Sequence, residues 1–278
     1  MSVVTNKVAG LCPIRRQRAQ AEARGAFARV GERTEAQRLF ETGGLRWRFP
    51  RSSSPCEAAI VNTGGGVAGG DSYRVSLELG EGAEVEATTP SAERIYRSDG
   101  PGAAIATRLK LAPGARLFWL PQETLMFEGA ALERRLEVEM SAKASVVIAE
   151  TLVFGRLAMG ESRIDASLRD SWRVRRDGRL VFADETRLEH AGAALEHKAV
   201  GAGARAVAMI VAGAPNIEAR LPDLRAALTA ESSAVETGAS AFDGLIVVRL
   251  LAASSDRLRP ALLASIVALG GRKPRLWP

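Results

Sequence analysis

Histidine and cysteine are nearly missing from this sequence, which has two of each in 278 residues. Cys12 and Cys56 stand in no metal-binding or redox spacing, so no disulfide framework is indicated and a reducing cytoplasm is the expected location. Hydrolytic triads and metal sites that need histidine have only His190 and His197 as candidates. No adjacent cysteine or carboxylate pattern makes a convincing metal site of either, and we interpret both as surface residues.

Long apolar runs and clustered basic residues are missing as well. No stretch reaches the ~18 consecutive apolar residues of a membrane span, and Thr5, Asn6 and Lys7 interrupt the N-terminal apolar stretch that a secretory signal would need. The formal net charge is +6, but the arginines are dispersed and no nucleic-acid-binding module is evident. With an apolar fraction of 46%, the sequence predicts a soluble globular protein with no nucleic acid and no membrane among its partners.

Strand patterns dominate what is present. Apolar residues recur at every second position in 72–79 (SYRVSLEL), 136–140 (LEVEM) and 164–174 (IDASLRDSWRV), the last with Asp170 as the one exception. This alternation predicts strands with one buried face. Helical spacing appears late, in 222–234 and 254–271, with strands predicted at 205–213 and 243–252.

Three strand junctions look alike: LGEGAEV at 79–85, LAPGARL at 111–117 and MSAKASV at 140–146. Each places an apolar residue and a turn ending in Ala before a new strand. Their starts at 79, 111 and 140 are 32 and 29 residues apart, which suits a β-solenoid-like stack or two facing sheets. Hairpin turns of an ordinary β-sandwich fit the pattern equally well.

The glycine-rich stretch 62–71, NTGGGVAGGD, is no phosphate-binding loop. Asp71 follows the glycines where a P-loop needs Lys and then Ser or Thr, and the next residues alternate as a strand instead of opening a helix. Gly69 and Gly70 are typical of a sharp loop or strand crossing. Asp71 suits the capping of loop amides, or contact with a partner or a cation.

Four acids, Glu123, Glu128, Glu150 and Glu161, are candidates for acid/base chemistry. A β-solenoid hydrolase acting on carbohydrate would need two carboxylates about 5 to 10 Å apart in an open cleft. Nothing in the sequence shows that these acids meet, and they are equally typical of strand-edge charges paired with arginine. A β-sandwich binding module is the generic alternative.

Five segments occur in a telling order: NTGGGVAGGD, ATTPSAERIYRS at 87–98, LFWLPQETLMFEGA at 117–130, ETLVFGRLAMGE at 150–161, and PRLWP at the C-terminus. Together they resemble the UreD family of urease accessory proteins, called UreH in some organisms. The usual HPPGG is NTGGG here, Ile95 stands where the family has Lys, and Phe154 where it has Leu. The resemblance covers about 25–278.

The resemblance implies a non-enzymatic scaffold of urease maturation that binds UreF and, through it, the GTPase UreG, and that helps to deliver nickel to apo-urease. It implies a mainly β fold, a layered, β-helix-like stack of strands with a few α-helices towards the C-terminus. We therefore expect a single domain over 25–278, preceded by a flexible segment over 1–24.

An internal water-filled passage for transient Ni²⁺, with no permanently bound cofactor, is also implied. Oxygen ligands hold nickel more weakly than His or Cys, which suits transit. The matching candidates for the lining are Asp71, Thr89, Glu150 and Asp184. We assign partner or structural roles to the remaining motif residues, Gly69, Gly70, Tyr96, Arg97, Ser98, Gln122, Glu123, Arg156 and Glu161. The C-terminal helix and Trp277 either cover the core or dock UreF.

Overall fold

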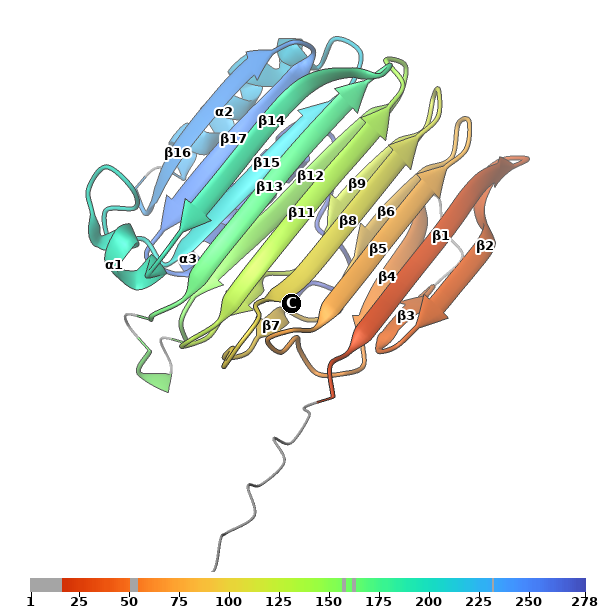
Figure 1. Ribbon diagram of the computed structural model, residues 1–278. Coiled ribbons are helices and arrows are strands. Elements are labelled where there is room, and N and C mark those ends of the chain that lie inside the picture. The colour runs from red at the N-terminus through yellow and green to blue at the C-terminus, as the bar shows by residue number, and fades with distance from the viewer. Residues whose placement is uncertain (1–16, 51–54, 157–158, 162–163, 232) are drawn as a thin grey trace, which may run out of the picture.

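The computed structural model describes residues 17–50, 55–156, 159–161, 164–231 and 233–278. Two sheets face each other across the core, and Figure 1 looks onto the first, sheet A, with the second, sheet B, behind it. Sheet A has the order β14-β13-β11-β8-β5-β1-β2. Its strands are β1 (Gln20–Val30), β2 (Arg33–Thr42), β5 (Ser72–Leu79), β8 (Ala103–Leu111), β11 (Ala131–Met140), β13 (Ser167–Arg176) and β14 (Arg179–Leu188).

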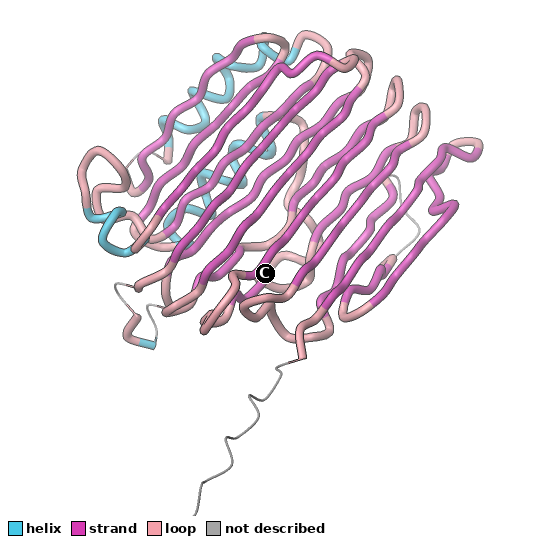
Figure 2. The backbone as a smooth tube through the Cα atoms, viewed as in Figure 1, coloured by secondary structure: helices cyan, strands magenta, loops and turns pink. Residues whose placement is uncertain are grey.

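Sheet B has the main order β16-β17-β15-β12-β9-β6-β4-β3, and the short strands β7 and β10 pair beside β12. Its strands are β3 (Leu45–Arg48), β4 (Cys56–Asn62), β6 (Glu84–Thr88), β7 (Glu93–Ile95), β9 (Arg116–Leu120), β10 (Thr124–Met126), β12 (Ser145–Phe154), β15 (Ala206–Gly213), β16 (Val235–Phe242) and β17 (Leu245–Ala252). The tube view in Figure 2 shows that far more of the chain forms strands than helices.

The three similar junctions are the corners at which the chain passes from sheet A to sheet B. They join β5 to β6, β8 to β9 and β11 to β12, and successive strands on each side pair in parallel. Ala83, Ala115 and Ala144 are fully buried, because each corner stacks on the next through bonds such as Arg116 N to Ala83 O and Ser145 N to Ala115 O. The predicted solenoid-like stack is thus confirmed, and its layers are two facing sheets.

Sheet B continues past the stack as an antiparallel extension, β12-β15-β17-β16, whose outer face is covered by helices. The covering elements are the 3₁₀ turn η2 (Ile217–Arg220), α2 (Leu221–Ala230) and α3 (Ser255–Ala268). The short helix α1 (Ala191–Glu196) lies elsewhere, and its Ala191 and Leu195 belong to the core cluster between the sheets. Helix α3 starts at the Ser254 cap, whose Oγ accepts from Arg257 N at 3.4 Å. Its buried face includes Leu258, Leu262 and Ile266, which pack on sheet B in a second apolar cluster.

The N-terminal boundary lies earlier than expected. Strand β1 begins at Gln20 and pairs in parallel with β5 from Ser72 onward, with Ala21 and Ala23 buried. Residues 20–24, assigned above to a flexible segment, therefore form the first half of a strand. Residues 1–16 lie outside the described residues.

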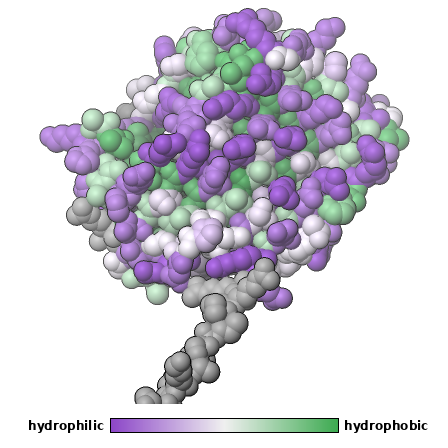
Figure 3. Space-filling view, in the orientation of Figure 1, coloured by the Kyte–Doolittle hydropathy of each residue, from purple (hydrophilic) through white to green (hydrophobic). Residues whose placement is uncertain are grey.

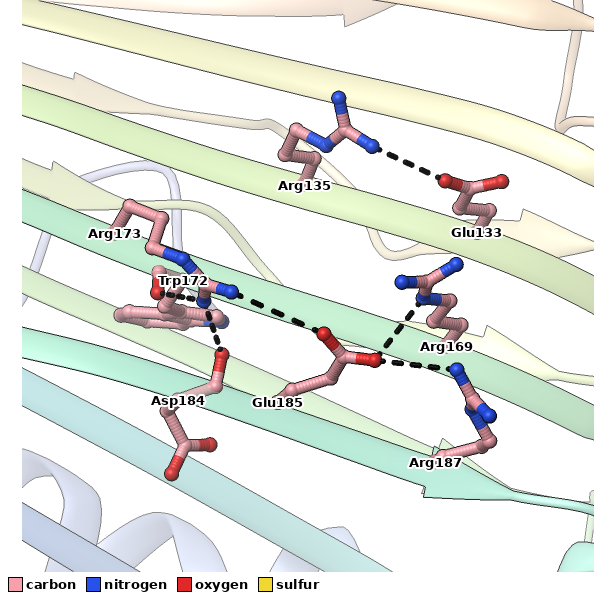
Figure 4. A network of polar contacts seen from close by, with 8 residues as sticks. All are labelled: Glu133, Arg135, Arg169, Trp172, Arg173, Asp184, Glu185 and Arg187. Carbon is pink, nitrogen blue, oxygen red and sulfur yellow. Dashed lines mark hydrogen bonds and ion pairs between the residues drawn. The ribbon is translucent and has the colours of Figure 1, made fainter.

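Within the described residues no helix covers the outer face of sheet A (Figure 1), and hydrophilic side chains are spread over it among apolar ones (Figure 3). Strand alternation puts arginines and glutamates there, as in Figure 4, where Glu185 of β14 accepts from Arg169 at 3.2 Å and Arg187 at 3.4 Å. The same alternation points the intervening residues of each strand inward. Most of these are apolar, so the few polar ones among them mark an unusual site.

Candidate functional site

Three charged side chains point inward from adjacent parts of the stack, where apolar residues would be expected. Arg134 lies on β11, Asp170 on β13 and Glu150 on β12, and each side chain is 6 or 7% exposed. Arg134 lies between Leu132 and Leu136 in the sequence, on the same inward-facing side of β11. We refer to Arg134, Glu150 and Asp170 as the central cluster.

Asp170 is fully engaged within the central cluster. Arg134 binds it with both arms of the guanidinium fork, Nε to Oδ1 at 3.0 Å and Nη2 to Oδ2 at 2.5 Å. Trp172 Nε1 donates to Oδ2 as well, at 3.3 Å. Bidentate arginine–carboxylate pairs are among the strongest charge-assisted hydrogen bonds, so this half of the cluster is rigidly defined.

Within the described residues, only one carboxylate oxygen of Glu150 accepts a hydrogen bond. Trp119 Nε1 donates to Oε1 at 2.8 Å. Arg134 Nη1 forms an ion pair with Oε2 at 2.9 Å, but Oε2 accepts no hydrogen bond from the described residues. A buried carboxylate oxygen in this state is costly and calls for an explanation.

The charges of the cluster follow from burial and proximity. Burial raises the pKa of Glu150 and Asp170 adds to the rise, against the opposing effects of the Arg134 charge and the Trp119 N–H. Burial works to lower the pKa of Arg134, but Asp170 and Glu150 outweigh it and raise that pKa. The guanidinium is therefore permanently charged, between two acids.

The central cluster separates two cavities that lie between the sheets. One, of 210 Å³, is lined by residues of β13, β14, β15 and β17 as well as by Arg134 and Glu150. The other, of 90 Å³, is lined by residues of β4, β5 and β8 and by the same Arg134 and Glu150. A third space of 60 Å³ shares Asn62, Thr89 and Glu93 with the second. The three therefore form a row that crosses the strands along the stack.

Both ends of this row reach the surface. The 60 Å³ space is bordered by the exposed loop residues Gly65, Pro90 and Ser91 and by the exposed Arg94 of β7. Strand β7 lies at the lower edge of Figure 1. The 210 Å³ cavity is bordered at its far side by Thr186 and Val200, which are exposed, and by Asp184 and Arg249, which form an ion pair. We call this row of cavities the passage.

Three of the four predicted lining residues lie on the passage. Glu150 borders both larger cavities, Thr89 borders the 90 Å³ cavity, and Asp184 borders the 210 Å³ cavity. Asp71 is not among the residues that line it. Its two carboxylate oxygens accept from the backbone N–H groups of Ala19 and Ala68, each at 2.8 Å, which is the loop-capping arrangement.

The chain matches the family of UreD urease accessory proteins over residues 19–278. It is 48% identical to the urease accessory protein UreD of Beijerinckia indica subsp. indica over 261 residues, 94% of this chain and 97% of that protein. The proteins of the same name from Methylobacterium sp. (strain 4-46) and Xanthobacter autotrophicus are 47% and 46% identical, over 95% and 94% of this chain and 96% and 91% of their own length. The chain belongs to the UreD family. Its role is accordingly in urease maturation.

The UreD motif around the glycines forms a tightly packed loop beside the first mouth of the passage. A Cβ on Gly69 would lie 2.2 Å from Ser98 Oγ, and Gly70 has φ +83°, so both positions require glycine. Tyr96 donates to Gly65 O at 3.0 Å and is 39% exposed. Arg97 is exposed beside it and pairs with Asp99 at 3.3 Å.

Gln122 and Glu123 tie the C-terminal end of the chain to the stack. Gln122 Nε2 donates to Leu276 O at 3.5 Å and to Pro90 O of the stack at 2.9 Å. Glu123 accepts from Arg259 of α3 at 2.5 Å. Trp277 is 7% exposed and donates from Nε1 to Thr88 Oγ1 at 3.0 Å. The C-terminal tryptophan therefore covers the core, as one of the two expectations had it.

Arg156 and Glu161 form the expected pair, with Arg156 N and Nε both 3.0 Å from Glu161 Oε2. Arg156 also stacks over Phe127, 4.2 Å from the ring centroid. Glu128 accepts from Asp165 N at 2.9 Å.

The acids considered for a hydrolase are held separately. Glu123 is bound to α3, Glu128 caps an exposed loop, and Glu150 is buried beside Arg134. An acid pair facing an open cleft, which glycoside hydrolysis requires, is not formed by these residues.

Sequence reasoning missed Arg134 as the residue at the centre of the site, and noticed Asp170 only as a break in the strand pattern. Both stand at inward positions of alternating strands, and that parity was the available signal. Among the described residues, no group of three or more His, Cys, Asp or Glu could hold a metal ion. Nor is any helix in that part of the chain long and apolar enough to cross a membrane.

Proposed function

We propose that this chain is a non-enzymatic scaffold of urease maturation, which binds UreF and, through it, the GTPase UreG, and which passes nickel to apo-urease through its interior. It acts in the cytoplasm and binds no permanent cofactor. The family membership supports the part played in urease maturation. The passage and its charges support the nickel cargo.

The single observation that carries the cargo proposal is the buried acidity at the middle of the passage. Glu150 and Asp170 together carry two negative charges against one positive charge of Arg134, so the central cluster has a net charge of −1 when both acids are ionised. A cation gains from that charge in a poorly solvated interior. Carboxylate and hydroxyl oxygens exchange a divalent ion more readily than thiolates and imidazoles do, which suits cargo rather than storage.

The partner surface is proposed at the loops around the first mouth. Tyr96 and Arg97 are exposed there on a loop fixed from below by the packing of Ser98 on Gly69. Aromatic and arginine side chains on a rigid base are favoured at the centres of protein interfaces. A partner bound there would stand over the entrance to the passage.

The test uses cells that make apo-urease, UreF, UreG and either this chain or a variant, with nickel per urease as the readout. Glu150→Gln keeps the shape of the side chain but removes its charge, and we expect it to lower nickel content strongly while UreF still co-purifies. Glu139→Gln, on the outward face of β11, is the matched control and should have no effect. Wild-type nickel content with Glu150→Gln, or without the chain altogether, would refute the proposal.

A further inference from the structure

We propose that Arg134 is the gate of the passage, a built-in cation that occupies the acidic pair and that a divalent cation must displace in order to cross. The inference deepens the proposed function and rests on it, since it concerns the control of the same cargo. In this proposal Arg134, and not the two acids alone, determines which ion is bound and keeps its residence time short.

The position of Arg134 is what a gate requires. The 210 Å³ and 90 Å³ cavities share Arg134 and Glu150 in their walls, and Arg134 reaches across from β11 of sheet A to Glu150 of β12 in sheet B. An ion that moves between the cavities therefore has to pass these two side chains.

The contacts of Arg134 are unequal, and this permits a stepwise exchange. Asp170 is held by two hydrogen bonds from the guanidinium, whereas Glu150 Oε2 faces it without one. An incoming cation can thus bind Oε2 before the guanidinium lets go of Asp170. An oxygen without a hydrogen bond is a costly feature in a purely structural ion pair. The gate explains Glu150 Oε2 as the atom that the incoming cation binds first.

Charge makes the guanidinium and the cargo mutually exclusive. With Arg134 in place and both acids ionised, the central cluster carries −1, and a bound Ni²⁺ would change this to +1. With the guanidinium withdrawn, Ni²⁺ and the two ionised acids sum to zero. A net charge is costly in a low-dielectric interior, so the second arrangement is favoured. A monovalent ion would leave −1 after replacing the guanidinium and so gains nothing over it.

The displaced side chain has somewhere to go. The 90 Å³ cavity is lined by Thr107 and Thr124, in addition to Asn62 and Glu93, so polar groups border the space next to the guanidinium. A space of this size with several polar partners can also hold water. When Arg134 returns to Asp170 it expels the ion, which makes the hold transient.

The deciding experiment measures Ni²⁺ binding by the full chain co-purified with UreF, using equilibrium dialysis with the metal alone and then removal of the ion by a chelator. Arg134→Gln removes the competing cation, so Ni²⁺ should bind at least about tenfold more tightly, equivalent to about 1.4 kcal/mol, and leave more slowly. Adding Glu150→Gln to that variant should return the affinity to the wild-type level or below. The outward neighbour Arg135→Gln is the matched control and should bind as wild type does.

Arg134→Lys serves as the second variant, because lysine keeps the charge but cannot bind Asp170 as a fork. It should bind Ni²⁺ more tightly than wild type and less tightly than Arg134→Gln, and it decides the matter if the glutamine variant fails to fold. Wild-type affinity in a folded Arg134→Gln chain, or in Arg134→Lys, overturns the gate. That result leaves the proposed function standing if Glu150→Gln still lowers nickel delivery, so the two failures are distinguishable.

Discussion

Arg134→Met is expected to be one of the most destabilising single substitutions in the chain. Methionine fills similar space but supplies no charge, so Glu150 and Asp170 remain buried with no cation between them; both are 6% exposed. Removing one partner of a buried ion pair costs about 3–5 kcal/mol, because a charge is left uncompensated. For a domain of this size that corresponds to a fall in Tm of roughly 6–20 °C.

The assay is thermal and urea unfolding of wild type, Arg134→Met and the triple variant in which Glu150→Gln and Asp170→Asn are added. The triple variant should recover most of the loss, because no buried charge is left. Glu150 already has a raised pKa through burial, and losing the guanidinium raises it further. A carboxyl whose folded pKa is raised costs stability only where it is ionised, above the ordinary glutamate pKa of about 4.3.

The deficit of Arg134→Met should therefore be largest near pH 8 and shrink as the pH falls towards 5. A loss of less than about 1 kcal/mol at pH 8, below the range for a buried ion pair, would show that water reaches the acids freely and would refute this account of the cluster. So would a triple variant no more stable than the single one.

Three further predictions concern the parts that hold the stack together. Gly69→Ala should destabilise by about 1–3 kcal/mol through overpacking, since its Cβ would meet Ser98 Oγ at 2.2 Å, and urea unfolding of the double variant with Ser98→Gly should show partial recovery. Trp277→Phe should cost about 1 kcal/mol for its lost hydrogen bond and Trp277→Ala about 3–5 kcal/mol, in the same assay; equal losses would contradict the packing role. Arg272→Ala should release the C-terminal segment, because Arg272 binds buried Glu86 at 3.0 Å, and limited proteolysis should detect this. Burial raises the pKa of Glu86, and the Arg272 charge opposes this rise. The increase in proteolysis caused by Arg272→Ala should therefore be largest near pH 8 and become smaller towards pH 5, where more of Glu86 is protonated.

Most of the fold could be predicted from the alternation of apolar and polar residues, because in a strand with one buried face every second residue points to the core. Leu132, Leu136 and Val138 define the inward face of β11, and the corner alanines predict the stack because a larger side chain would not fit between layers. The N-terminal boundary at residue 25 followed from the extent of the family resemblance. Alternation did not correct it, because β1 mixes the small residues Ala21, Ala23 and Gly25 with charged ones, which weakens the contrast between its two faces.

The site was less predictable because its parts meet only in space. Asp170 stood out as a polar residue at an inward position, but its partner Arg134 lies 36 residues away, next to another arginine that points outward. The alternation of β11 puts Arg134 on the inward side, but only the register of β11 with β13 sets it opposite Asp170. Asp71 was predicted to line the passage, but its role is local. An aspartate that caps two loop N–H groups gives the same short sequence motif as a functional carboxylate would.

The central claim, that nickel crosses the interior, is tested most directly by blocking the passage without touching a charge. Val207 lines the 210 Å³ cavity, and Val207→Trp would fill much of it, whereas Ala106→Trp on the exposed outer face of β8 adds the same ring outside. We predict that urease matured with Val207→Trp contains far less nickel per active site than urease matured with Ala106→Trp, at equal UreF binding and equal unfolding midpoints. Equal nickel content with the two variants would contradict the account.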